Sequence, residues 1–276
     1  MSQRGAAGLS EAPRTVEGMD NWQPLPLWED DPEPAEAEVS AAAAAPVATA
    51  TWADAVGVFD LETTGVDVER DRVVTAHVGL LGPGGAVLQS RGWLADPGVE
   101  IPEGATAVHG ITTAHAREHG RPAAHVVGEV VAALQELFDA GIPVVAYNAP
   151  YDFSLLKYEA LRHGIPPITD PSPVIDPLVL DKAHDRFRKG KRTLEVVAAH
   201  YAVTLEGAHD AMADAVAAGR VAQALARRYE LNGPVAELHA QQIGWARTQA
   251  DSLTDYFIRI GRLDPEDRID GSWPIR

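Results

Sequence analysis

The sequence of 276 residues contains no cysteine and no apolar run that approaches the length of a membrane-spanning helix. The absence of cysteine excludes disulfide bonds, zinc sites built from thiolates and thiol nucleophiles, and it is compatible with a reducing compartment. A membrane span needs roughly 18–20 consecutive apolar residues, and the N-terminus lacks the apolar segment of a secretory signal peptide. We therefore expect a cytoplasmic protein without a membrane partner.

Positive charge is also scarce. The chain has 23 Lys and Arg residues against 40 Asp and Glu residues, which gives a formal net charge of −17. Proteins that bind phosphate groups usually show a basic balance, so this composition taken alone argues against a nucleic acid as partner. The charge is uneven, however: residues 1–50 carry nine acidic and two basic groups, a net charge of −7, which leaves −10 for residues 51–276.

Residues 1–50 also lack an amphipathic period, and they contain several prolines and a run of five alanines at 41–45. Such a segment cannot bury enough apolar surface to offset the entropy lost on ordering, so we predict a disordered arm. One stretch of this arm, Trp-Gln-Pro-Leu-Pro-Leu-Trp at 22–28, is either a docking motif or a short hydrophobic stretch without a function.

From residue 51 onward the sequence contains apolar runs and regular apolar spacing. Apolar runs predict strands at 55–61, 72–81, 86–94, 142–147 and 174–175, and the turn residues at 82–85 indicate that the second and third strands form a hairpin. Apolar residues at helical spacing predict helices over 122–140, 150–163, 193–201 and 210–229. A hairpin followed by βα units indicates an α/β domain over 51–231, with a mixed β-sheet flanked by helices.

Residues 232–276 are predicted as a helical C-terminal extension, because an amphipathic pattern runs over 235–260 after the Asn-Gly-Pro turn at 232–234. Its apolar positions fit a helix that packs on the domain or on a partner, and the segment from 264 onward is expected to be irregular. The sequence leaves the oligomeric state open.

The first chemical motif lies at the end of the first predicted strand. Asp60 and Glu62 stand at positions i and i+2, so their side chains point to the same face of the sheet. Two carboxylates side by side repel each other, and a divalent cation removes that conflict. Hard oxygen ligands suit Mg²⁺ or Mn²⁺. A solvated strand end with two incidental acids is the alternative that this motif alone does not exclude.

Two further motifs place acidic groups beside element ends. Asp152 falls in the first turn of a helix that follows a buried strand, where it is either a ligand or a partner of the helix dipole. His209 and Asp214 converge only if His209 precedes the next helix while Asp214 projects from it. Asp210 shares a face with Asp214, and we expect it to serve at the helix start instead.

Taken together, these motifs resemble those of the DEDDh 3′–5′ exonucleases in the DnaQ-like branch, the branch of the DNA polymerase proofreading subunits. The matching segments are Phe-Asp-Leu-Glu-Thr-Thr-Gly at 59–65, Val-His-Gly-Ile-Thr at 108–112, Tyr-Asn-Ala-Pro-Tyr-Asp-Phe at 147–153 and Gly-Ala-His-Asp-Ala at 207–211. The resemblance covers roughly residues 54–230 and implies a ribonuclease H-like fold. Tyr147 departs from the pattern, since many members have His there, and this change affects contacts to the nucleotide rather than to metal.

The resemblance implies two divalent cations, Mg²⁺ or Mn²⁺, held by Asp60, Glu62, Asp152 and Asp214. It implies that His209 is the general base, since imidazole accepts protons near neutral pH, and that Glu62 also takes part in catalysis. The same resemblance places Thr63, Thr64, Gly65, His109 and Asn148 along the terminal nucleotide.

A basic loop at 186–192 has five cations in seven residues. Its composition favours contact with phosphates over a merely solvated loop, and we expect Arg188 and Lys191 to bind the nucleic acid.

The favoured function is a 3′–5′ exonuclease that acts on single-stranded or frayed DNA 3′ ends in repair or proofreading and releases nucleoside 5′-monophosphates. An exoribonuclease that acts on RNA 3′ ends or short oligoribonucleotides is the first alternative, because the same motifs serve both substrates. The second alternative is a docking or scaffold component of a polymerase or repair assembly, which would be bound through the arm or the C-terminal extension. Gln-Gln-Ile at 241–243 is a weak candidate for a clamp-binding peptide.

Overall fold

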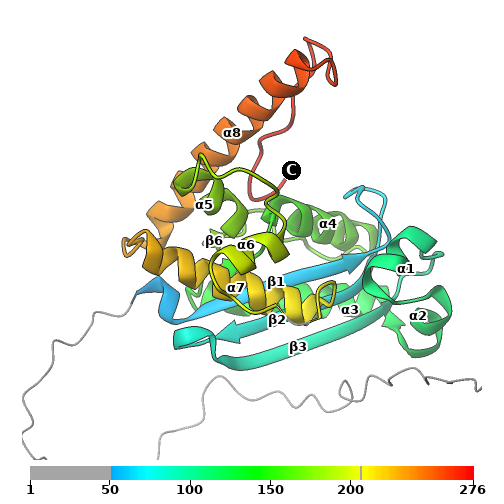
Figure 1. The fold of residues 1–276 in the computed structure, drawn as a ribbon. Helices are drawn as coiled ribbons and strands as arrows, with labels where there is room; N and C mark the ends of the chain where they lie inside the picture. The colour runs from blue at the N-terminus through cyan, green and yellow to red at the C-terminus, as the bar shows by residue number, and fades with distance from the viewer. Residues whose placement is uncertain (1–50, 206) are drawn as a thin grey trace, which may run out of the picture. The chain divides into compact units, whose positions relative to one another are not determined.

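The computed structural model describes residues 51–276 except residue 206 (Figure 1). The predicted arm at 1–50, with its stretch at 22–28, lies outside the described residues. A first 3₁₀ turn, η1 (Trp52–Asp54), leads into the sheet.

The centre of the sheet is a set of three antiparallel strands, β1 (Val56–Thr63), β2 (Val73–Leu81) and β3 (Val87–Asp96). The turn between β2 and β3 contains a short 3₁₀ segment, η2 (Pro83–Gly85), in which Gly84 adopts a φ of 68° that glycine tolerates without strain. The predicted hairpin is therefore confirmed.

Short parallel strands complete the sheet on both sides. β5 (Val144–Val145) pairs with β1, β6 (Val174–Ile175) pairs with β5, and β4 (Arg121–Pro122) pairs with β3. The strand order is β4-β3-β2-β1-β5-β6. The sheet is thus mixed, as the sequence predicts, with the hairpin antiparallel and the later strands parallel.

Helices cover both faces of this sheet, and the alternation of β1 side chains decides which residues meet which helices. Phe59 and Leu61 point into a core formed with α3 (Ala123–Asp139) and α4 (Ala149–Arg162). Val56 and Val58 belong to the opposite core, which is formed with α5 (Pro177–His184), α6 (Leu194–His200) and α7 (Ala211–Arg228). Asp60 and Glu62 share the parity of Val58, so they face the side of α7.

The approach of α7 to the sheet is close because Gly219 has no side chain. A Cβ atom at this position would lie 2.5 Å from Cγ1 of Val58 and 2.6 Å from Cδ1 of Leu81. This close packing brings the first turn of α7 against the end of β1, where the acidic motif lies.

The C-terminal segment packs against the β6 side of the sheet and then returns to the core. In α8 (Val235–Arg259), Gln242 is fully buried, and its side chain accepts from the backbone N–H of Asp176 at 2.7 Å and donates to the carbonyl of Val174 at 3.0 Å. Farther along, Trp273 is buried in the core around α4. Because Gln242 is buried in this way, the segment at 241–243 is not free to act as a clamp-binding peptide.

Three helices were not predicted from the sequence: α1 (Glu103–His109), α2 (Thr113–His119) and α5 (Pro177–His184). α1 and α2 have at most one buried residue each, so no apolar face marks them in the sequence. The start of α5 did carry a signal, since Asp176 caps the helix and Pro177 is its first residue. None of the described helices has the length and apolar character needed to cross a membrane.

Candidate active site

The first acidic pair lies where β1 leaves the core. Along this strand Asp60 and Glu62 are the two positions that are only partly buried, while their neighbours are buried. Burial, followed by the charges of Asp152 and Glu62, raises the pKa of the Asp60 carboxyl well above its usual range. Burial and the nearby charges of Asp214 and Asp210 raise the pKa of Glu62 to about 8. The strand end therefore concentrates negative charge in a place that water solvates poorly.

Asp152 joins this pair from the first turn of α4. Its side chain is 3% exposed, and its Oδ1 accepts a hydrogen bond of 3.2 Å from the backbone N–H of Leu61, which lies between the two acids of β1. Burial raises the pKa of Asp152 well above the usual range, although this hydrogen bond acts in the opposite direction. The contact with Leu61 shows that Asp152 interacts with β1 and not only with the dipole of its own helix.

The start of α7 supplies the third group. His209 precedes the helix in the left-handed conformation, with φ of 67°, and its backbone N–H donates to Oδ2 of Asp214 at 3.2 Å. Asp210 is the N-cap, and its Oδ1 accepts from the N–H of Ala213 at 3.0 Å. The prediction that Asp210 serves at the helix start is thus confirmed, while Asp214 projects from the first turn.

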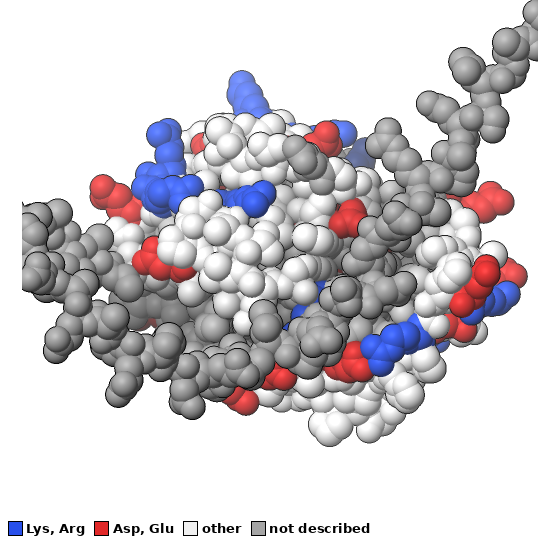
Figure 2. Space-filling view, turned by 90° about the horizontal axis from the view of Figure 1, so that it is seen from below, with Lys and Arg blue, Asp and Glu red and all other residues white. Residues whose placement is uncertain are grey.

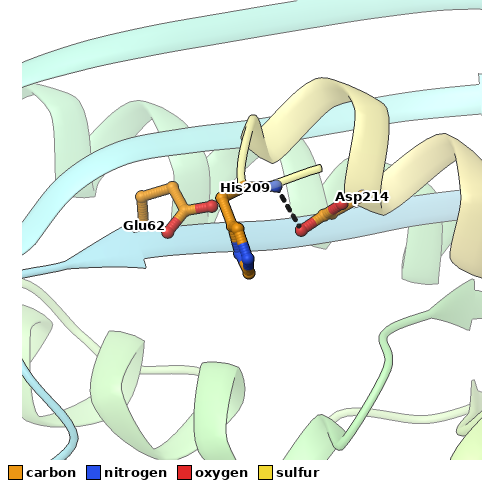
Figure 3. Close-up of side chains that lie close together, drawn as sticks. All are labelled: Glu62, His209 and Asp214. Carbon is orange, nitrogen blue, oxygen red and sulfur yellow. Dashed lines mark hydrogen bonds between the residues drawn. The ribbon is translucent and has the colours of Figure 1, made fainter. Parts of the chain in front are cut away.

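Glu62, His209 and Asp214 come together in space, although Glu62 lies about 150 residues before the other two in the sequence. One ligand atom from each of these three side chains lies within 4.8 Å of the other two, and Figure 3 shows Glu62 on β1 facing the start of α7. Oδ1 of Asp214 is buried and has no hydrogen-bond partner within the part of the chain that the structure describes. An unpartnered buried carboxylate oxygen beside a second carboxylate and an imidazole is a suitable donor set for a cation.

His77 and Asp210 belong to the surroundings of this cluster, and only Asp210 is indicated by a sequence motif. His77 lies opposite Asp60 on β2, it is 2% exposed, and burial lowers its pKa to about 4. Asp210 contributes to raising the pKa of Asp60, Glu62 and Asp214. The pairing across two strands carries no motif of its own, which is why sequence reasoning missed His77.

The turn after β1 uses its side chains internally. The hydroxyl of Thr63 donates to the carbonyl of Gly65 at 2.7 Å and contacts the hydroxyl of Tyr151, which also donates to that carbonyl at 2.6 Å. The hydroxyl of Thr64 donates to Oδ1 of Asp71 at 2.9 Å. A Cβ at Gly65 would lie 2.5 Å from Oδ2 of Asp71. These side chains therefore fix the shape of the turn, and Tyr151 is a participant that sequence reasoning missed.

Asn148 and His109, two predicted substrate contacts, lie at the start of α4 and at the end of α1. Asn148 is the exposed N-cap of α4 in a left-handed conformation with φ of 65°, and its N–H donates to Oδ1 of Asp176 at 3.0 Å. His109 ends α1, and its Nδ1 accepts from the N–H of Ile111 at 3.1 Å. Burial lowers the pKa of His109, a hydrogen bond with the backbone of Thr63 acts in the opposite direction, and the charge of His209 lowers the pKa further.

In the structure Arg188, which is predicted to bind nucleic acid, forms ion pairs within the chain. Its guanidinium pairs with Asp181 at 2.5 Å and with Asp185 at 3.3 Å, and the side chain is only 12% exposed. Arg192 also binds Asp181. These two arginines hold the basic loop on α5, because the carboxylate of Asp181 is fully buried and needs the compensating charge. Lys191, in contrast, is exposed.

Comparison with known proteins identifies the family. Residues 58–222 match the family RNase_T, described as Exonuclease. The chain is 32% identical over 165 residues to "DNA polymerase III PolC-type" of Streptococcus agalactiae, covering 59% of this chain and 10% of that polymerase. The corresponding polymerase of Clostridium perfringens is 30% identical over 169 residues, covering 61% and 11%. The chain thus spans about a tenth of the length of these relatives.

Solved structures share the fold. Escherichia coli Exonuclease I in complex with a dA16 oligonucleotide superposes with a TM-score of 0.56 at 20% identity, covering 64% of this chain and 42% of that one. Exonuclease I from Methylocaldum szegediense has a TM-score of 0.52 at 21% identity, covering 64% and 41%. The family match includes β1, α4 and the start of α7, which carry the acidic cluster, and this family uses divalent metals. The chain belongs to the RNase_T family of exonucleases, a family of 3′–5′ exonucleases that are phosphodiester hydrolases.

Proposed function

We propose that the chain removes nucleotides from DNA 3′ ends, single-stranded or frayed, and releases nucleoside 5′-monophosphates. The observation that carries this proposal is the convergence of Glu62, His209 and Asp214 within 4.8 Å, next to the charges of Asp60 and Asp152. This arrangement offers carboxylates for cations and an imidazole for a proton at the same place.

The residues present fit a pair of divalent cations, Mg²⁺ or Mn²⁺. Burial raises the pKa values of Asp60, Glu62, Asp152 and Asp214, and repulsion between these neighbouring carboxylates adds to the rise. Oδ1 of Asp214 lacks a partner among the described residues. We assign these four carboxylates as the ligands. When bound, such cations stabilise the attacking water and the departing 3′-oxygen of an in-line displacement.

His209 is the proposed general base. Its exposed side chain is carried by a backbone that Asp214 fixes through the hydrogen bond of 3.2 Å. In the reaction a water oxygen forms a bond to phosphorus and the bond from phosphorus to the 3′-oxygen breaks. His209 takes the proton of that water, and the 3′-oxygen gains a proton from solvent. Glu62, within reach of the same imidazole, orients the water in this scheme.

DNA is favoured over RNA because of what the relatives are. The matched polymerases are DNA polymerases, and Exonuclease I was solved with dA16 and dT13 oligonucleotides. A polymerase or repair assembly is therefore the proposed partner, and proofreading or repair the proposed setting. An exoribonuclease remains the alternative, because the 2′-hydroxyl is what distinguishes RNA from DNA, and neither Thr63 nor Asn148 is assigned a contact with it.

The test is digestion of 5′-labelled single-stranded DNA, duplex DNA and RNA of one sequence in Mg²⁺, in Mn²⁺ and in EDTA. We expect stepwise shortening of DNA from the 3′ end with either cation and none in EDTA. The variant Asp152→Asn keeps the oxygen that accepts from Leu61 and removes the charge, so it should lose activity while remaining folded. Asp210→Asn is the matched control, because Asn also caps helices well, and it should retain most activity.

Faster degradation of RNA than of DNA would replace the proposal with the exoribonuclease. Activity that survives EDTA, or an Asp152→Asn protein as active as Asp210→Asn, would contradict the cation-dependent mechanism.

A further inference from the structure

A pocket of about 560 Å³ lies between α5 with its following basic loop and the face of α8. Lys182, Arg186 and Arg192 line one side of it, and Trp245 and Tyr256 line the other. Gln249 of α8 donates to the carbonyl of Val179 on α5 at 3.0 Å, which fixes the distance between the two walls. The pocket is thus a built feature of two packed helices, outside the acidic cluster.

The pocket concentrates positive charge in an acidic chain. No Asp or Glu is among its lining residues, although residues 51–276 carry a net charge of −10. The Lys182 side chain is partly buried and feels the charges of Asp176 and Asp181, but it forms no hydrogen bond or ion pair among the described residues. Arg192 is paired with Asp181, while Arg186 is exposed beside the ring of Phe187. Figure 2 views the molecule from below and shows Lys and Arg side chains interspersed with Asp and Glu side chains on that face. A half-buried cation without a partner favours an anionic ligand.

Aromatic rings complete the pocket. Tyr256 is 44% exposed and presents its ring to solvent, while Trp245 is partly buried and held by an edge contact with the ring of His184 at 5.3 Å. Exposed rings beside cations are the combination that binds a base by stacking and its phosphate by charge.

The pocket is connected to the active-site edge of the sheet. The hydroxyl of Tyr147 donates to the carbonyl of Arg192 at 2.6 Å, and Tyr147 directly precedes Asn148, the N-cap of the helix that carries Asp152. This contact places the end of the basic loop beside Tyr147, five residues before the proposed metal ligand Asp152.

We propose that this pocket binds a nucleotide of the substrate strand on the 5′ side of the scissile end, with its phosphate at Lys182 and Arg186 and its base against Tyr256 and Trp245. The assignment rests on the proposed function for the identity of the strand. It gives the chain a second contact with substrate, away from the site of hydrolysis, and so predicts that affinity depends on strand length.

The test measures binding of oligothymidylates of three and twelve nucleotides, labelled with fluorescein at the 5′ end, to the full chain in EDTA by fluorescence anisotropy. Lys182→Gln/Arg186→Gln removes the pocket's free cations. Arg227→Gln/Arg228→Gln, at the exposed end of α7, makes the same change of charge elsewhere. The preference for the twelve-mer is the ratio of the Kd of the three-mer to that of the twelve-mer. We expect this ratio to fall about ten-fold in the pocket variant and to change less than about two-fold in the control.

Two further readouts separate a nucleotide contact from a loss of fold. Because Lys182 and Arg186 share one phosphate, removing both should reduce the slope of log affinity against log salt by about 0.7 for a single strand. Tyr256→Ala should weaken binding of the twelve-mer, whereas Tyr256→Phe should bind it as the wild type does, because stacking needs the ring and not the hydroxyl.

An unchanged length preference in the pocket variant, or an equal loss in the control, would overturn the assignment. Equally tight, Lys182-dependent binding of free thymidine 5′-monophosphate would also overturn it, since the pocket would then hold a free nucleotide. A failed exonuclease assay is distinguishable, because the binding measurements need no hydrolysis. Length-dependent binding without digestion would contradict the proposed function and leave the pocket assignment intact.

Discussion

His209 occupies a backbone conformation that restricts which residues can replace it. Its φ of 67° lies in the left-handed region, which Asn adopts more readily than most residues. His209→Asn therefore removes the imidazole while keeping the backbone in place. If His209 takes the proton from water, we expect kcat to fall by about 10²–10⁴, with KM nearly unchanged, in steady-state assays at saturating Mg²⁺.

The matched control for this prediction is His109→Asn, at the neighbouring histidine that we place beside the terminal nucleotide. We expect it to raise KM more than it lowers kcat. A His209→Asn enzyme with a kcat within ten-fold of the wild type would mean that another group, or water alone, accepts the proton.

Glu62 links the site to stability. Its pKa is raised to about 8 in the folded chain, against roughly 4.3 in an unfolded one, so the folded state binds this proton more tightly. Raising the pH from about 4.5 to about 8 therefore removes stability from the metal-free protein. Glu62→Gln abolishes this titration. We therefore expect the Tm difference in EDTA between the variant and the wild type to shift by roughly 2–4 °C in favour of the variant from pH 5 to pH 8, which corresponds to about 1 kcal/mol in the free energy of unfolding.

Mg²⁺ provides the control for this measurement. At pH 8 it should raise the Tm of the wild type more than that of Glu62→Gln, because the variant has lost one proposed ligand. A Tm difference in EDTA that stays constant across this pH range would contradict the coupling.

At the scale of single residues, local motifs were enough to predict the acidic cluster and not enough to predict its supports. Asp60 and Glu62 are two residues apart, so the strand period places them on one face. His209 and Asp214 are five residues apart, and they meet because His209 precedes the helix while Asp214 projects from its first turn. Tyr151 and His77 act through contacts with Gly65 and Asp60 that depend on the packing of separate elements. No period in the sequence encodes such contacts, so only the structure reveals them.

At the scale of elements, Asp176 holds together the turn that positions α4. This carboxylate is 1% exposed and accepts from the N–H groups of Asn148, Ala149 and Leu178 and from the indole of Trp273. Asp176→Ala would leave these donors unpaired, so we expect a loss of roughly 2–5 kcal/mol in the free energy of unfolding and a lower kcat, because Asp152 follows this turn. Urea unfolding and steady-state kinetics measure the two effects.

Thr112→Ala is the matched control for Asp176→Ala. Thr112 caps α2 through one hydrogen bond of 3.1 Å to the N–H of His115, so its loss should cost about 1 kcal/mol. Equal losses in the two variants would show that Asp176 is only a helix cap.

The longest helices predicted from the sequence are those in which the apolar period repeats most often. α3 and α7 have 17 and 18 residues and recurrent buried positions, so their apolar faces can be recognised in the sequence. β5 and β6 were also predicted, since short apolar runs between turn residues indicate buried strands. α1 and α2 were missed because each has seven residues and at most one buried position.

For the molecule as a whole, net charge was a poor guide to its chemistry. The four carboxylates at the active site contribute to the −10 of residues 51–276, and they lie where proposed cations would compensate them. The pocket beside α8 has the opposite sign. The position of charge within the fold, and not its sum, therefore decides whether a polyanion binds.

The segment after α8 tests how far the core extends along the chain. The sequence predicts an irregular segment here, and it has no helix or strand, yet Trp273 is 6% exposed, packs on His239 with ring centroids 4.9 Å apart, and donates to Oδ2 of Asp176 at 3.3 Å. Trp273→Ala should cost roughly 3–5 kcal/mol. Trp273→Phe keeps most of the packing and loses the hydrogen bond, so about 1 kcal/mol is expected from that bond.

Urea unfolding of the two variants, followed by far-ultraviolet circular dichroism, measures both losses. Activity should fall in the same order, because the indole reaches the carboxylate that supports the turn before α4. If Trp273→Ala unfolds within about 0.5 kcal/mol of the wild type, then this segment does not contribute to the core in solution, and the support of Asp176 comes from backbone N–H groups alone.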